Sequence, residues 1–156
     1  TAIITRFRPA LDLTGDRDRG GAVFKKVCAT CHRAEGQGND VGPNLATVTG
    51  RTPEDLLVHI LDPNREVAPN YVNYNVETTD GRVVSGLIAE ESGNAVTLKR
   101  AEGASDIVPR NRIETIASSG LSLMPEGLEQ GLAPQDFADL ISYVRGIQAG
   151  GQTGIR

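Results

Sequence analysis

The sequence predicts a mainly α-helical domain of three or more helices, interrupted by a small antiparallel β meander or partial barrel. Two observations carry this prediction. Apolar residues recur at helical spacing near both ends of the 156-residue chain, and the period changes to that of strands over about 71–117. The length suits a single domain, or a single domain with an insertion.

Three segments have the apolar spacing of amphipathic helices, at 20–28, 52–62 and 134–148. Thr52 is a suitable N-cap for the second of them, and Pro53 is compatible with a first helical turn. Together they make up the expected α-helical part of the domain.

The strand-rich segment begins with a hairpin signal. Asp80-Gly81, a pair typical of a type I′ turn, separates the alternating stretches 73–79 and 82–90. Shorter strands are expected at 95–100, around Ile107 and at 113–116, so that the segment forms an antiparallel meander.

The two ends of the chain lack such periods. We expect residues 1–19 to form an extended lead-in or linker, and residues 150–156 to form a flexible tail after the glycines that weaken the last helix. The domain proper is therefore expected to span 20–149.

Both cysteines and one of the two histidines fall within five consecutive residues, Cys28-Ala29-Thr30-Cys31-His32. C-x-x-C-H is the attachment motif of a c-type haem. The two thiols add to the vinyl groups of the macrocycle, and the histidine is aimed at the iron as its first axial ligand. One covalently bound haem c is therefore the expected cofactor.

Three other functions of these cysteines and this histidine are alternatives to haem attachment. A thioredoxin-like dithiol requires a C-x-x-C after a strand, whereas a helical pattern precedes Cys28. A zinc site would combine Cys28, Cys31, His32 and His59, although zinc ligands are usually spaced more widely than the adjacent Cys31 and His32. A disulfide between Cys28 and Cys31 is the third.

Composition excludes several classes of protein. The net charge of −4 and the lack of a basic run argue against nucleic acid as a partner. No apolar run approaches membrane-spanning length. The chain begins at Thr1, and we interpret it as a mature or excised fragment. Because haem attachment of this kind occurs on the outer face of the inner membrane, the expected location is periplasmic.

Five segments, in the same order along the chain, resemble class I cytochromes c. They cover the two ends of the chain, about half of it. They are Gly20 and Phe24 before the haem motif, Gly42-Pro43-Asn44-Leu45, Gly50-Arg51, Ser122-Leu123-Met124-Pro125, and Asp139-Leu140-Ile141-Ser142-Tyr143.

The middle of the chain departs from that pattern and is similar to the haem-binding domain of the planctomycete and verrucomicrobial type. The stretches that carry this second resemblance are Ile60-Leu61-Asp62-Pro63-Asn64, Thr79-Asp80-Gly81-Arg82 and Ser122–Leu128. In that family the domain often lies at the end of a larger secreted protein, which would explain why the sequence shows no signal peptide.

The first resemblance implies the haem ligands. His32 would bind the iron through Nε2 and donate its other ring proton to the carbonyl of Pro43. Met124, the only methionine, would be the second axial ligand, and a core methionine is the alternative. His59 is the fallback distal ligand, although we interpret it as a solvated residue on a helix face.

The resemblance also implies residues around the haem. Arg51 would meet a propionate, for which its charged fork is suited, or would be a plain surface arginine. Phe24 and Leu45 would line the pocket, and Pro43 could equally serve only to stiffen its loop. Tyr71 could stack on the haem edge or simply pack on a sheet.

With both axial positions filled, the expected function is one-electron transfer and not enzymatic catalysis. The partners would be redox proteins, or a fused dehydrogenase domain, in a periplasmic dehydrogenase system or respiratory chain. A haem-based sensor or a peroxidase-like enzyme with a labile sixth ligand is the alternative. A third possibility is that the strand-rich segment is an interaction module tethered to the haem domain.

Overall fold

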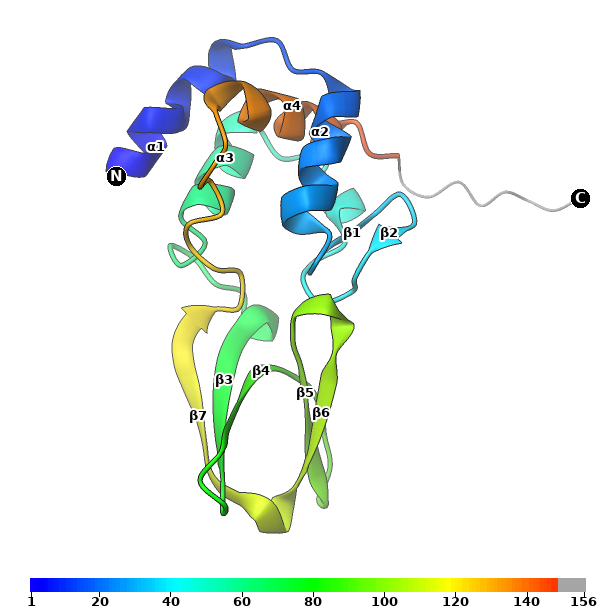
Figure 1. The fold of residues 1–156 in the computed structure, drawn as a ribbon, viewed down its shortest axis with the longest axis vertical. Helices are drawn as coiled ribbons and strands as arrows, with labels where there is room; N and C mark the ends of the chain where they lie inside the picture. Colours follow the sequence, from blue (N-terminus) through cyan, green and yellow to red (C-terminus); the bar gives the residue numbers. More distant parts are fainter. Residues whose placement is uncertain (149–156) are drawn as a thin grey trace, which may run out of the picture.

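The computed structural model describes residues 1–148 and consists of a helical part next to a curved β-sheet (Figure 1). The α-helices of the described residues are α1 (Ala2–Phe7), α2 (Arg17–Val23), α3 (Pro53–Leu61) and α4 (Pro134–Arg145). The strands are β1 (Arg33–Ala34), β2 (Gln37–Gly38), β3 (Val72–Thr78), β4 (Val83–Glu91), β5 (Ala95–Lys99), β6 (Ser105–Pro109) and β7 (Ile113–Ser122).

The main sheet has five antiparallel strands in the order β6-β5-β4-β3-β7. The predicted hairpin at Asp80-Gly81 joins β3 and β4, and the last strand returns to pair with the first, with Val76 opposite Ile116. One face of the sheet has its own buried apolar cluster, formed by Val76, Val96, Leu98 and Val108.

The expected mainly α fold is wrong. The described part of the chain has four α-helices, and the five strands of the main sheet hold about as many residues as those helices. The reason is that alternating apolar residues give the strand-rich segment a core of its own, so that the sheet is a separate structural unit beside the helical part.

The N-terminal segment also differs from the extended lead-in expected at 1–19. It is helical over Ala2–Phe7 and continues as a 3₁₀ helix over Arg8–Asp12. Ile4, Phe7 and Ala10 recur every third residue and are buried, and the Phe7 ring lies 4.7 Å from that of Phe137. The tail expected at 150–156 lies outside the described residues.

The first and last helices expected from the sequence, α2 and α4, cross in close contact. A Cβ atom on Gly20 would lie 1.9 Å from the carbonyl oxygen of Asp139, so only glycine allows this approach. Next to the crossing, the rings of Phe24 and Tyr143 lie 5.4 Å apart. This contact fixes the direction in which the chain leaves α2 toward the cysteines.

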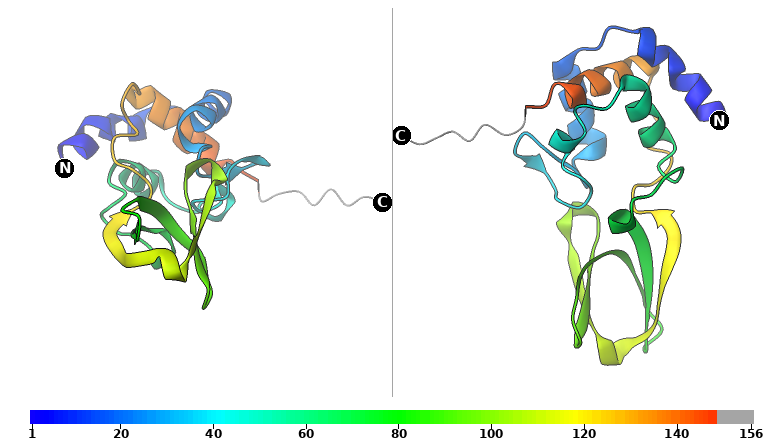
Figure 2. Two further views of the ribbon diagram at one scale, coloured as in Figure 1. Left: turned by 60° about the horizontal axis from the view of Figure 1, so that its bottom comes forward. Right: turned by 180° about the vertical axis from the view of Figure 1, so that it is seen from behind.

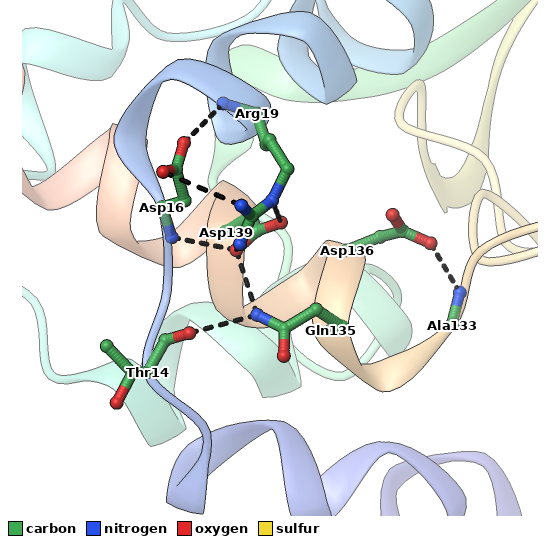
Figure 3. Close-up of polar contacts among 7 residues, drawn as sticks. All are labelled: Thr14, Asp16, Arg19, Ala133, Gln135, Asp136 and Asp139. Atoms are coloured by element: carbon green, nitrogen blue, oxygen red, sulfur yellow. Dashed lines mark hydrogen bonds and ion pairs between the residues drawn. The ribbon is translucent and has the colours of Figure 1, made fainter.

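A buried carboxylate ties the start of α2 to α4 (Figure 3). Asp139 is only 2% exposed and accepts hydrogen bonds from the Asp16 N–H (2.7 Å), Arg19 Nε (2.8 Å) and Gln135 Nε2 (2.9 Å). Burial alone would raise the pKa of Asp139, but these donors outweigh burial and hold it below its ordinary value.

α3 begins as the sequence predicts. The Thr52 hydroxyl accepts a hydrogen bond from the Asp55 N–H (3.2 Å), and Pro53 is the first helical residue. Leu56, Leu57 and Leu61 are buried against the other helices. None of the helices in residues 1–148 has the length and apolar character needed to cross a membrane.

Candidate haem-attachment site

The two cysteines and His32 lie where α2 ends. The helix continues through a wider π-helical turn, Phe24–Cys28, and then closes on itself, because the N–H groups of Cys31 (3.1 Å) and His32 (2.9 Å) both donate to the Cys28 carbonyl. Both cysteines are half-buried and unpaired with each other, so no disulfide forms between them.

His32 is held in one orientation by the following loop. Its Nδ1 lies 2.7 Å from the carbonyl oxygen of Pro43, which can only accept, so Nδ1 carries the proton and Nε2 has a free lone pair. Gly42 lies flat against the ring, where a Cβ would be 2.6 Å from Cε1. Burial lowers the pKa of His32, which favours the neutral imidazole that can bind a metal.

The surroundings of the cysteines disfavour thiolate chemistry. Burial, with a smaller contribution from Cys31, raises the pKa of Cys28 to about 12, and burial also raises the pKa of Cys31. Dithiol exchange and zinc binding both require thiolates. A thioether carries no charge and suits the same environment.

The zinc alternative also lacks its fourth ligand. His59 Nε2 lies 2.7 Å from Arg51 Nη1, so its lone pair is already used. Within residues 1–148, no three His, Cys, Asp or Glu side chains are placed to share a metal ion. The geometry of this loop, with two neutral thiols and one oriented imidazole, fits a covalently attached haem.

A turn of the main sheet takes part in this site, which the sequence did not predict. The Glu102 N–H, in the 3₁₀ turn Ala101–Gly103 between β5 and β6, donates to the Thr30 carbonyl at 2.8 Å. Asn39 donates to the neighbouring Ala29 carbonyl from its backbone N–H (3.0 Å) and from Nδ2 (3.2 Å), and it packs on Gly103. Every carbonyl from Cys28 to Thr30 is thereby satisfied.

Met124 lies in the segment that joins β7 to α4 and is half-buried. Its N–H donates to the Ser122 hydroxyl (3.1 Å), and the Leu123 N–H donates to the Tyr71 carbonyl (3.1 Å). In Figures 1 and 2 this segment and the one that follows α2 run along opposite sides of the helical part. Tyr71 thus takes part through its backbone, next to the start of β3.

The remaining predicted residues lie around these segments. Phe24 is fully buried between α2 and α4, and Leu45 is half-buried against the helical core. Arg51 is exposed, and its Nη1 lies 2.7 Å from Nε2 of the half-buried His59. These residues belong to the helical part, on the same side of the sheet as the attachment loop.

Reasoning from the sequence gave no role in the site to three residues: Asn39, Glu102 and Asn64, the last of which was named only within a stretch that carries the family resemblance. Asn64 accepts a hydrogen bond from the Ser122 N–H (2.8 Å) and donates one to Glu126 (3.0 Å), on either side of Met124. Asparagine in a loop carries no signal of its own, and the partners of Asn64 lie 58 and 62 positions away along the chain.

Comparisons with known proteins agree with the geometry. The family model for cytochrome c matches residues 18–97, which include the attachment motif and exclude Met124. A cytochrome c-553-like protein of Synechocystis sp. is 32% identical over 75 residues, covering 41% of this chain and 70% of that protein.

Plant cytochromes c are similar over a shorter stretch. That of Stellaria longipes is 50% identical over 38 residues, 24% of this chain and 35% of its own length. That of Arabidopsis thaliana is 43% identical over 42 residues, 26% and 38% of the two chains. The chain thus spans little more than a third of these plant relatives. It belongs to the cytochrome c family and is a c-type cytochrome, with covalently bound haem c that serves electron transfer.

Proposed function

We propose that His32 and Met124 are the two axial ligands of the haem iron and that the chain works as a one-electron transfer module. The observation that carries this proposal is the 2.7 Å hydrogen bond between His32 Nδ1 and the Pro43 carbonyl. It fixes the tautomer whose Nε2 can bind iron, and it raises the basicity of that nitrogen.

The support for Met124 is the ordering of its loop. Three successive N–H groups, of Ser122, Leu123 and Met124, each have a defined acceptor, and Pro125 stiffens the next position. A flexible thioether becomes a good ligand only when its backbone is held in place in this way.

Haem iron ligated by histidine and methionine cycles between its ferric and ferrous states, and the thioether favours the ferrous one. The side chains of the protein would hold and surround this group. Cys28 and Cys31 would anchor the group, His32 and Met124 would bind its iron, and Phe24 and Leu45 would contribute to apolar surroundings that exclude water. With no open position on the iron, the chemistry left is the transfer of one electron to or from a partner.

In this proposal the chain is a domain of the planctomycete and verrucomicrobial type, located in the periplasm. It passes electrons between a fused or separate dehydrogenase and a further redox protein. The stretches Asp62-Pro63-Asn64 and Ser122–Leu128, together with the strand-rich segment between them, support this assignment. Arg51, exposed at the edge of the helical part, would pair with a haem propionate in place of His59.

Optical spectroscopy of the purified holoprotein tests the ligands. We expect a ferric sulfur-to-iron charge-transfer band, its loss in Met124→Ala, and no rapid binding of carbon monoxide by the ferrous wild type. His59→Ala is the matched control and should keep the band, because it removes the other candidate ligand.

A wild-type protein without the band that binds carbon monoxide at once would contradict the proposal. The iron would then have an open or labile sixth position, as a haem-based sensor or a peroxidase-like enzyme requires.

A further inference from the structure

The loop that carries Met124 is held at both ends by one side chain from another part of the fold. Asn64 Oδ1 lies 2.8 Å from the Ser122 N–H, and Asn64 Nδ2 lies 3.0 Å from Glu126 Oε1. Ser122 precedes Met124 by two positions and Glu126 follows it by two. The amide therefore bridges the loop across the methionine.

The orientation of this amide is determined by its partners. A backbone N–H can only donate, and a carboxylate can only accept, so the oxygen of Asn64 must face Ser122 and the nitrogen must face Glu126. An amide is the side chain that offers an acceptor and a donor on one carbon. Aspartate at this position would keep the first bond, lose the second and repel Glu126.

Asn64 is itself presented by a rigid turn after α3. The Arg65 N–H donates to the Asp62 carbonyl at 3.1 Å, and the side chains of the same two residues form an ion pair at 3.0 Å. Pro63, buried at the second position of this turn, fixes the backbone just before Asn64. The turn thus links the end of α3 to the methionine loop.

We propose that Asn64 is a positioning residue for the axial methionine, and that its two hydrogen bonds keep the Met124 sulfur on the iron. This inference rests on the proposed ligation by Met124. Methionine has three rotatable bonds and forms a comparatively weak bond to iron, so the free energy that holds it comes in large part from the loop. Loosening either end of the loop increases the fraction of time that the sulfur is off the iron.

The rate of carbon monoxide binding to the ferrous holoprotein measures this fraction, since the gas binds only when the methionine has left. In Asn64→Asp, which preserves size, we expect this rate to rise about tenfold, because a hydrogen bond is lost and two carboxylates face each other. The ferric sulfur-to-iron band should weaken in parallel.

The rescue experiment exchanges the amide at position 64 with the carboxylate at position 126. In the double variant Asn64→Asp with Glu126→Gln, the amide lies on the loop and the carboxylate on the turn, so both bonds can form again. We expect the rate to return to within about twofold of wild type. Glu126→Gln alone, and Glu66→Gln at an exposed position two residues after Asn64, are matched controls and should also stay within about twofold.

Two results would overturn the inference: an unchanged rate in Asn64→Asp, or a double variant as fast as Asn64→Asp alone. Failure of the proposed ligation gives a different pattern. The wild type itself would then lack the band and bind carbon monoxide as fast as Met124→Ala, whatever residue occupies position 64.

Discussion

At the scale of single residues, the negative charge of Asp139 contributes to the stability of the fold. Its carboxylate is buried and accepts from a backbone N–H, a guanidinium and an amide at the crossing of α2 and α4. Because its folded pKa is lowered, the ionised form stabilises the fold. This contribution is present above the unfolded pKa and is lost as the pH falls through the folded pKa.

Asp139→Asn should lower the free energy of unfolding by about 2 kcal/mol at pH 7, since a buried charged acceptor with several donors is replaced by a neutral amide. Urea denaturation of the holoprotein measures this change in the free energy of unfolding. The difference from wild type should shrink as the pH falls below about 4, the pKa of an aspartate in the unfolded chain, and on through the lowered pKa of the folded carboxylate.

The matched control is Glu90→Gln, which neutralises an exposed carboxylate on the sheet and should change stability by less than about 0.5 kcal/mol. An effect of Asp139→Asn that is equally large at pH 7 and pH 3 would show that the charge of Asp139 is not what stabilises the crossing.

At the scale of elements, the contact between α2 and α4 determines where the cysteines and His32 lie. The helices approach so closely at Gly20 that any side chain would meet the backbone of Asp139. The attachment loop begins one helical turn and a π-helical turn beyond this point. A shift of α2 would therefore move Cys28 and His32 together.

Gly20→Ala should destabilise the holoprotein by about 3 kcal/mol, because the added methyl group would lie 1.9 Å from a carbonyl oxygen that cannot move without α4. A thermal melt followed by circular dichroism measures the effect. Gly93→Ala, in the turn between β4 and β5 with open space around it, should melt within a few degrees of wild type. Equal melting temperatures for the two variants would contradict the close packing.

The turn between β5 and β6 is the second element that defines the site. Glu102 adopts a left-handed backbone with φ of 64°, which is uncommon for a residue other than glycine. In this conformation its N–H reaches the Thr30 carbonyl inside the haem motif. The strand-rich segment thus contacts the attachment loop directly, in addition to its connections through Tyr71 and Ser122.

At the scale of the whole molecule, two apolar cores lie side by side, one in the helical part and one in the sheet. The haem motif and the methionine loop both lie where these two parts meet (Figure 1). The sheet contributes the Glu102 N–H, which binds the haem motif, and β7 contributes Ser122, at which the methionine loop begins. Both loops therefore depend on the docking of the sheet.

Much of this arrangement could be predicted from local sequence. Thr52-Pro53 marks the start of α3, and Asp80-Gly81 marks the β3–β4 hairpin. The five residues from Cys28 to His32 define the attachment site. Each of these signals consists of residues that are adjacent in the sequence, so no knowledge of the fold is needed to recognise it. The hydrogen bond from His32 to Pro43 was expected from the family resemblance, and the structure contains it.

The features that could not be predicted depend on hydrogen-bond partners far along the chain or on apolar patterns too short to identify a helix. Asn64 and Glu102 act through bonds to segments far along the chain, and nothing adjacent to either residue signals the partner. The pattern of Ile4, Phe7 and Ala10 covers too few turns to identify a helix, since helices this short are stable only by packing. The strands have alternating apolar residues in either case, and only their pairing into one sheet shows that they form a core of their own.

A potentiometric titration of the wild type and of Met124→Ala tests the central claim, one-electron transfer by a haem held between His32 and Met124. We expect a single transition with a slope of about 59 mV per decade, as a one-electron couple requires, and a lower midpoint potential in the variant, which lacks the thioether that favours ferrous iron. The same midpoint potential in both proteins would contradict ligation by Met124.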